Sequence, residues 1–144
     1  MRIRKATRAD FDFIFRGQKE VAEKFEKREF FEGRYKGKIH AGIREGRIFI
    51  AEDEKGARLG FVEYLFNPPF TCLTGYLWLD WAYVIQSARG KGVGSALYAH
   101  MEKLARRKKL KGLACDVFVV NVRSQRFHEK QGFKKTIHIY QKEF

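Results

Sequence analysis

One continuous segment, residues 75–109, constrains the fold more than any other part of the chain. Its first part, residues 75–85, is apolar and aromatic with Asp80 as the only charge, a pattern typical of a buried strand. Residues 94–109 place apolar side chains at helical spacing, as expected for an amphipathic helix. Such a strand, loop and helix in succession predict an α/β domain in which the helix packs on a sheet. The loop between them carries three alternate glycines: Gly90, Gly92 and Gly94.

The rest of the chain supplies the strands and helices around this segment. A strand is predicted over residues 1–6, followed by a helix that starts at Thr7, with Asp10 at capping-box spacing. Glycines interrupt residues 28–45, which predicts a short helix with loops. The fold class is therefore α/β, a mixed sheet with helices, in a single domain over residues 1–144. The other predicted elements are strands over residues 47–51, 59–66, 113–120 and 134–142 and a short helix over residues 124–131.

Composition limits the class of protein. The 144 residues are 44% apolar and 15% aromatic, which is enough for a buried core and argues against a disordered chain. No apolar run approaches the roughly 18 residues that a membrane-spanning helix needs, so we expect no membrane partner. Polar residues follow the basic N-terminus, where a signal peptide would be apolar. Cys72 and Cys115 form neither a CxxC pair nor a disulfide framework, which favours a reducing cytoplasm.

The net charge of +13 leaves the partner open. Thirty Lys and Arg residues attract polyanions in general, so a nucleic acid and an anionic cofactor such as a nucleotide phosphate both fit. A plain solvated surface fits equally well. The basic residues are scattered apart from one dense run, residues 106–109, which is usual at the end of a solvated helix. A nucleic-acid partner is therefore disfavoured but not excluded.

The glycine loop is suited to bind a phosphate group. Glycine adopts positive φ and lets the backbone approach a ligand closely, and the N–H groups of a helix N-terminus attract anions. Arg89 and Lys91 add positive charge beside the loop. Two common phosphate-binding patterns do not fit, because no Walker spacing occurs and a Rossmann fingerprint that starts at Gly90 would need a glycine where Ser95 stands.

Two motifs, in the same order as in the family, resemble those of the GNAT superfamily of N-acetyltransferases. The first, Arg89-x-x-Gly92-x-Gly94, is similar to the family's pyrophosphate loop, Gln/Arg-x-x-Gly-x-Gly/Ala. The resemblance extends more loosely over the whole chain. It implies a mixed, mainly antiparallel sheet flanked by helices, with a splayed strand pair that holds acetyl-CoA. The second motif, Asn-x-x-Ala/Ser-x-x-x-Tyr-x-x-x-Gly-Phe, is matched by Asn121, Ser124, His128, Gly132 and Phe133.

The resemblance also implies a cofactor-binding role for each matching residue. The strand before the loop would bind the pantetheine arm through its backbone, and the loop amides would hold the pyrophosphate. The strands that carry Val84 and Val120 would splay apart, so that the arm lies between them. The implied cofactor-binding residues are Tyr83, Val84, Ile85, Arg89, Gly90, Lys91, Gly92, Val93, Gly94, Ser95, Asn121 and Ser124.

Two side chains are candidates for proton transfer. His128 stands where many GNAT relatives have a tyrosine that protonates the leaving thiolate, and a pKa of about 6.5 suits this work. Asp80 is the candidate base, since burial raises the pKa of a carboxyl, and Glu63 on the neighbouring strand is a second. Plain structural roles on the helix and strand are the alternatives. The histidines show no spacing that predicts a metal site.

The expected activity is transfer of an acetyl group from acetyl-CoA to a primary amine of a small molecule or a protein, by direct attack. Two alternatives keep the same scaffold without catalysis: a basic nucleic-acid-binding module and a module that senses acyl-CoA. The resemblance implies that residues 28–46 and 67–75 choose the acceptor, whose identity the sequence does not predict. Homodimers are common among relatives, and the sequence leaves the oligomeric state open.

Overall fold

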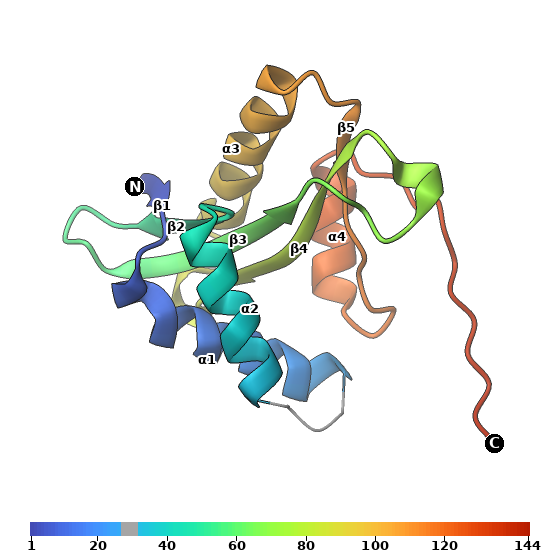
Figure 1. Cartoon of the computed structure of the whole chain (residues 1–144), viewed down its shortest axis with the longest axis horizontal. Coiled ribbons are helices and arrows are strands. Elements are labelled where there is room, and N and C mark those ends of the chain that lie inside the picture. The colour runs from blue at the N-terminus through green and yellow to red at the C-terminus, as the bar shows by residue number, and fades with distance from the viewer. Residues whose placement is uncertain (27–31) are drawn as a thin grey trace.

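A five-stranded sheet forms the centre of the computed structural model, which describes residues 1–26 and 32–144 (Figure 1). The first four strands pair antiparallel with their neighbours, and the last pair is parallel. This confirms the mixed, mainly antiparallel sheet. In spatial order the strands are β1 (Arg2–Lys5), β2 (Ile48–Glu52), β3 (Arg58–Leu65), β4 (Tyr76–Val84) and β5 (Gly112–Ala114).

Helices cover both faces of the sheet (Figure 1). On one face lie α1 (Phe11–Val21), which continues as a π-helical turn over Ala22–Glu26, and α2 (Glu32–Arg44). On the other lies α3 (Val93–Arg107), with α4 (Val122–Lys130) beside it. None of the helices described is long and apolar enough to cross a membrane.

Alternation along the central strands produces two separate cores. On β2, Ile48 and Ile50 face α1 and α2, while Phe49 and Ala51 face α3. Every residue of β2 is buried, as expected for a strand with helices on both faces. Each fully buried aliphatic or aromatic side chain stabilises the fold by about 1.5–3 kcal/mol, so the two cores hold the layers together.

The prediction for residues 28–45 was wrong where the structure describes them, because residues 32–44 form one continuous helix, α2. Residues 28–31 lie outside the described part. One of the glycines that suggested loops, Gly42, instead lets the helix approach the sheet. A Cβ on Gly42 would lie 2.7 Å from Glu63 Oε1 and 2.8 Å from Ile48 Cδ1. At this position glycine serves packing and not a break in the helix.

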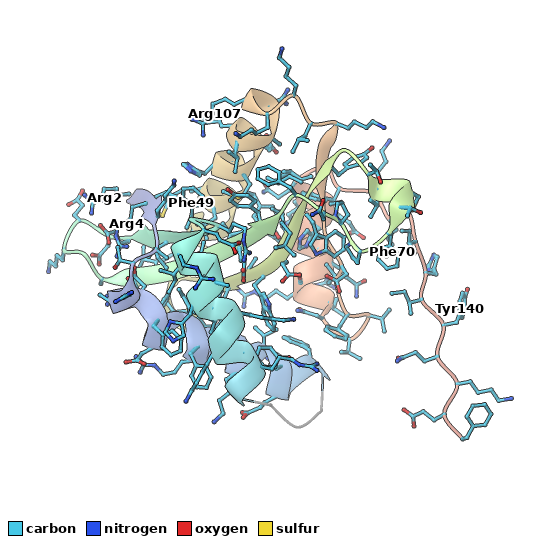
Figure 2. The ribbon with its side chains drawn as sticks, in the orientation of Figure 1. Arg2, Arg4, Phe49, Phe70, Arg107 and Tyr140 are labelled. Atoms are coloured by element: carbon cyan, nitrogen blue, oxygen red, sulfur yellow. The ribbon has the colours of Figure 1, made fainter. Side chains whose placement is uncertain are left out.

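Of the two strands predicted near the C-terminus, one is much shorter than predicted and the other does not form. The strand predicted over residues 113–120 is only Gly112–Ala114, and Val119 and Val120 beyond it are 84% and 62% exposed. Residues 134–142 form no strand, and Tyr140 lies on a tail that runs away from the body of the protein (Figure 2). The alternation of apolar and polar side chains favours extended backbone in both segments. No strand of the described chain pairs with them, and a strand without a partner is not stable.

The helix predicted to start at Thr7 does start there, with Thr7 as its N-cap and Asp10 completing the predicted capping box. Its first turn is a 3₁₀ turn over Arg8–Asp10, and the buried Asp10 carboxylate fixes this entry. Asp10 is fully buried, and the Thr7 N–H donates to it at 2.8 Å. Arg4 on β1, labelled in Figure 2, donates two hydrogen bonds to this carboxylate and Arg58 on β3 donates another. Burial alone would raise the pKa of Asp10, but these donors outweigh it and hold the pKa below its ordinary range.

We expect Asp10→Asn to lower the free energy of unfolding at neutral pH by about 3–5 kcal/mol, because it breaks a buried ion pair. Since the folded pKa is depressed, the stabilisation is complete above the unfolded pKa of about 3.9 and is lost as the pH falls below it. The difference between wild type and variant should therefore shrink in acid. Urea unfolding at several pH values measures it, with the exposed Asp12→Asn as the matched control. An equal difference at pH 7 and pH 2 would contradict the assignment.

Candidate active site

A cleft of about 400 Å³ opens where the end of β4, the start of α3 and the start of α4 meet. Its fourth side is the end of α1 with the π-helical turn, which contributes Lys24 and Phe25. Of the residues predicted to bind the cofactor, Ile85 and Lys91 do not line the cleft. The predicted residues that do line it, with the predicted acid, are Tyr83, Val84, Arg89, Gly90, Gly92, Val93, Gly94, Ser95, Asn121, Ser124 and His128.

The cleft forms where β4 extends beyond the end of its parallel neighbour, β5. The β4–β5 ladder runs from Tyr76 and Gly112 to Trp78 and Ala114 and ends there, while β4 continues to Val84. Residues 82–84 then line the cleft along this open edge of the strand. The strands were predicted to part around Val84 and Val120, whereas the described chain leaves the sheet directly after Ala114.

The glycine turn presents backbone N–H groups to the cleft. Gly90 and Gly92 have φ values of +76° and +83°, which other residues rarely adopt, and a Cβ at either position would meet nothing within 4 Å. Gly92 is the N-cap of α3, and no side chain of the described residues caps this end of the helix. The first-turn N–H groups of α3 therefore face open space, at the positive end of the helix dipole.

A hydrogen bond holds the C-terminal end of α4 against the first turn of α3. Gln131 donates from Nε2 to the Ser95 hydroxyl at 3.0 Å. At the other end of α4, Asn121 caps the helix by accepting the Ser124 N–H at 3.1 Å. A Cβ on Gly94 would lie 3.2 Å from the ring of Phe127, so the two helices pack closely beside the cleft.

An ion pair spans the cleft between α1 and the glycine loop, and sequence reasoning missed it. Arg89 donates from Nε to the Val84 carbonyl at 2.9 Å and pairs through Nη2 with Glu20 at 3.2 Å. The Tyr83 hydroxyl donates to the other oxygen of Glu20 at 2.6 Å. Burial, followed by this hydrogen bond, raises the pKa of Tyr83 to about 12. Glu20 lies far from Arg89 in the sequence, and nothing in the residue pattern of its helix predicts a contact with the glycine loop.

His128 is 9% exposed on the cleft wall, and both of its ring nitrogens have protein partners. Its Nδ1 lies 2.7 Å from the backbone carbonyl oxygen of Ser124, one turn earlier in α4. Its Nε2 lies 2.8 Å from the hydroxyl of Tyr98 on α3. Burial lowers the pKa of His128 below its ordinary value, although the hydrogen bond to Ser124 opposes the shift. Burial therefore favours the neutral imidazole.

Several wall residues were not singled out from the sequence. Tyr98 is the most consequential, because its hydroxyl contacts His128 inside the cleft. The periodicity of α3 placed this region in the core, but apolar spacing does not show which buried hydroxyl meets a histidine on another helix. The described residues contain no group of three or more His, Cys, Asp or Glu able to hold a metal ion. The remaining wall residues missed are Glu20, Val21, Lys24, Phe25, Ala82, Ala88, Leu97, Arg123 and Phe127.

Comparison with known proteins assigns the family. Residues 6–133 match the family model described as the acetyltransferase (GNAT) family. The chain belongs to the GNAT acetyltransferase family. A search of curated proteins finds no match to this sequence. The family match covers the glycine turn, both strands that part and the whole of α4.

Solved structures agree with this assignment. A ribosomal-protein-alanine N-acetyltransferase from Brucella melitensis is 27% identical, with a TM-score of 0.74 over 93% of this chain and 85% of that one. An aminoglycoside N-acetyltransferase in complex with CoA is 19% identical, with a TM-score of 0.78 over 99% of this chain and 93% of that one. A tetramutant protein from Bacillus halodurans is 17% identical, with a TM-score of 0.84 over 100% of both chains. The last two likenesses show that the fold of this chain is shared with those proteins.

In this GNAT acetyltransferase, the burial expected for Asp80 occurs instead at Glu63. Asp80 is exposed, accepts a hydrogen bond from Trp78 Nε1 at 3.1 Å and lies outside the cleft wall. It is the extra residue of a β-bulge, since Glu63 pairs with Trp81 and the next residue of β3 pairs with Leu79. Glu63 is 4% exposed, and burial raises its pKa to about 7 even though Arg47 donates to it at 2.7 Å.

Glu63 should make the stability of this acetyltransferase depend on pH. Its folded pKa of about 7 lies above the unfolded value of about 4.3, so the folded state binds more protons in this window. Its contribution to stability is therefore full below about pH 4 and falls as the pH rises through about 7. We expect Glu63→Gln to flatten this part of the profile in urea unfolding, with Arg47 retaining its pair with Glu45 at 2.6 Å. The exposed Glu54→Gln is the control, and an unchanged slope in Glu63→Gln would disprove the assignment.

Proposed function

We propose that this protein transfers the acetyl group of acetyl-CoA to a primary amine, with the donor held in the cleft between β4 and α4. One observation carries the proposal. The glycine turn, the open end of β4 and the motif residues of α4 all line the same cleft. They come from distant parts of the sequence, and acyl transfer needs all of them: a phosphate anchor, an edge for the arm and a proton donor.

The residues present fit a donor that carries a diphosphate and an amide-containing arm. The N–H groups of Val93, Gly94 and Ser95 would bind the diphosphate, since no side chain described caps this helix. The exposed Lys91 would add charge from outside the cleft wall. The arm would lie along residues 82–84 and use their backbone groups as a neighbouring strand does.

The chemistry proposed for the site is direct attack of the amine on the thioester. Glu63 or the neighbouring Asp80 would take a proton from the incoming ammonium group through water, since neither lines the cleft. The raised pKa of Glu63, about 7, suits a base at neutral pH. Backbone N–H groups near the end of β4 would stabilise the negative charge on the carbonyl oxygen, and His128 would supply the proton for the leaving sulfur. Holding the two reactants in one cleft accounts for much of the rate.

Donor binding can be tested without knowing the acceptor. Acetyl-CoA at a hundredfold excess over its Kd should stabilise the wild-type protein by about 2.7 kcal/mol, seen as a rise in Tm. Gly92→Ala should abolish this rise, because alanine is strained at a φ of +83° and the turn would change shape. The control is Gly37→Ala on α2, where a Cβ meets nothing within 4 Å. This control should keep the full response, and equal responses in both variants would sink the phosphate-turn assignment.

The role of His128 is tested by His128→Ala in a thiol-release assay with a panel of amines. Loss of a proton-transfer residue should lower kcat by about 10²–10⁴-fold and leave the KM for acetyl-CoA unchanged. An unchanged kcat across the pH range would show that His128 takes no part in the chemistry.

The acceptor is proposed only as a primary amine. The relatives' names include a ribosomal-protein alanine and aminoglycosides, both of which carry such amines. The free cysteines, Cys72 and Cys115, support the cytoplasm as the site of action. The alternative of a nucleic-acid-binding module predicts affinity that falls steeply with salt, together with no thermal response to acetyl-CoA.

A further inference from the structure

The hydrogen bonds of His128 decide how it can exchange a proton. The backbone oxygen of Ser124 only accepts hydrogen bonds, so Nδ1, 2.7 Å away, must carry the hydrogen. In the neutral ring Nε2 then has a lone pair. The Tyr98 hydroxyl at 2.8 Å is therefore the donor, and His128 Nε2 is the acceptor. Neither nitrogen is left to face a substrate directly.

Tyr98 lines the cleft together with His128 and contacts it through its hydroxyl. It is 3% exposed, lies on the same wall as the glycine turn and sits on α3, the helix whose first turn would anchor the donor. Its ring packs edge-on against His128, Phe127 and Phe133, with centroids 5.0 to 5.9 Å apart. This packing fixes the direction of the phenolic hydroxyl.

We propose that Tyr98 is a proton-transfer residue, and that its hydroxyl carries protons between His128 and the reacting nitrogen and sulfur. The inference rests on the proposed acetyl transfer and adds to it a residue on α3. It changes the direct acid role of His128 into a role exercised through Tyr98 Oη.

The relay balances without an external acid. As the C–N bond forms, the nitrogen of the bound amine gives a proton to Tyr98 Oη while the original hydroxyl proton moves to His128 Nε2. As the C–S bond breaks, the imidazolium returns a proton to Tyr98 Oη, and the hydroxyl gives its proton to sulfur. The net change moves one proton from nitrogen to sulfur and restores both side chains. Because burial disfavours the imidazolium, His128 returns the proton readily.

Uncharged aromatic side chains pack against the pair. Cys115, outside α3 and α4, is a titratable group that interacts with Tyr98, and burial raises the pKa of its thiol to about 12, so it stays neutral. Ser124 contributes its hydroxyl at 3.3 Å from His128 Nδ1, besides its carbonyl. Phe127 and Phe133 are uncharged, and the pKa of His128 is set first by burial, which lowers it, and then by the hydrogen bond to Ser124, which opposes the shift.

Tyr98→Phe tests the relay, because it removes one oxygen and keeps the ring in its packing. We expect kcat for thiol release to fall by at least about 10²-fold, with acetyl-CoA binding and its thermal response retained. The double variant Tyr98→Phe/His128→Ala should be no slower than either single variant, since both act in one path. The matched control is Tyr64→Phe, a buried tyrosine of the α3-side core that lies outside the cleft wall. It should keep wild-type kcat.

Nitrogen NMR of the His128 ring gives a readout independent of any acceptor. The wild-type protein at neutral pH should show the neutral Nδ1–H form, and Tyr98→Phe should shift the Nε2 signal as its hydrogen bond is lost. An Nε2–H form would overturn the relay. So would a wild-type kcat in Tyr98→Phe, or single-variant losses that multiply in the double variant. If the wild-type protein itself releases no thiol with any amine, the proposed function fails and the relay fails with it.

Discussion

The early end of the β4–β5 ladder is the constraint on which the site depends. A strand inside a sheet satisfies its backbone groups with two neighbours, but beyond Trp78 and Ala114 β4 loses its parallel neighbour and still continues to Val84. The edge left in this way is where a ligand can take the place of a strand. The bulge at Asp80 lies in the same stretch and bends β4. The cleft is thus an interruption of the sheet, and α3 and α4 are positioned on its two sides.

In this strongly basic chain, two carboxylates pair with arginines from distant segments of the sequence. Asp10 collects donors from Arg4, Arg58 and the entry of α1, and so joins β1, β3 and the first helix. Glu20 joins α1 to Arg89 in the glycine loop, which brings the first helix to the rim of the cleft. Both pairings bridge segments far apart in the sequence. Part of the arginine content is therefore explained by these ion pairs within the fold, without a polyanionic partner.

What the sequence predicts well is local. The glycine turn follows from residues whose allowed φ values require it, and the helix that starts at Val93 follows from spacing within one segment. What it predicts poorly depends on distant partners. Gly42 suggested a loop until the sheet beneath α2 explained it, and residues 134–142 have the pattern of a strand without a strand beside them. Tyr98 was missed for the same reason, since its partner lies 30 residues away on another helix.

Two of the buried titratable groups, Glu63 and His128, bear on the proposed proton path. Burial raises the pKa of Glu63 to about 7 and lowers that of His128, so burial favours the uncharged form of each at rest. They lie on different sides of β4, with Glu63 under α2 and His128 against α3. A reaction that only moves a proton from nitrogen to sulfur creates no lasting charge in such surroundings. A path that left tyrosinate or imidazolium behind would be opposed by the same burial, and this favours a relay that restores both side chains within each turnover.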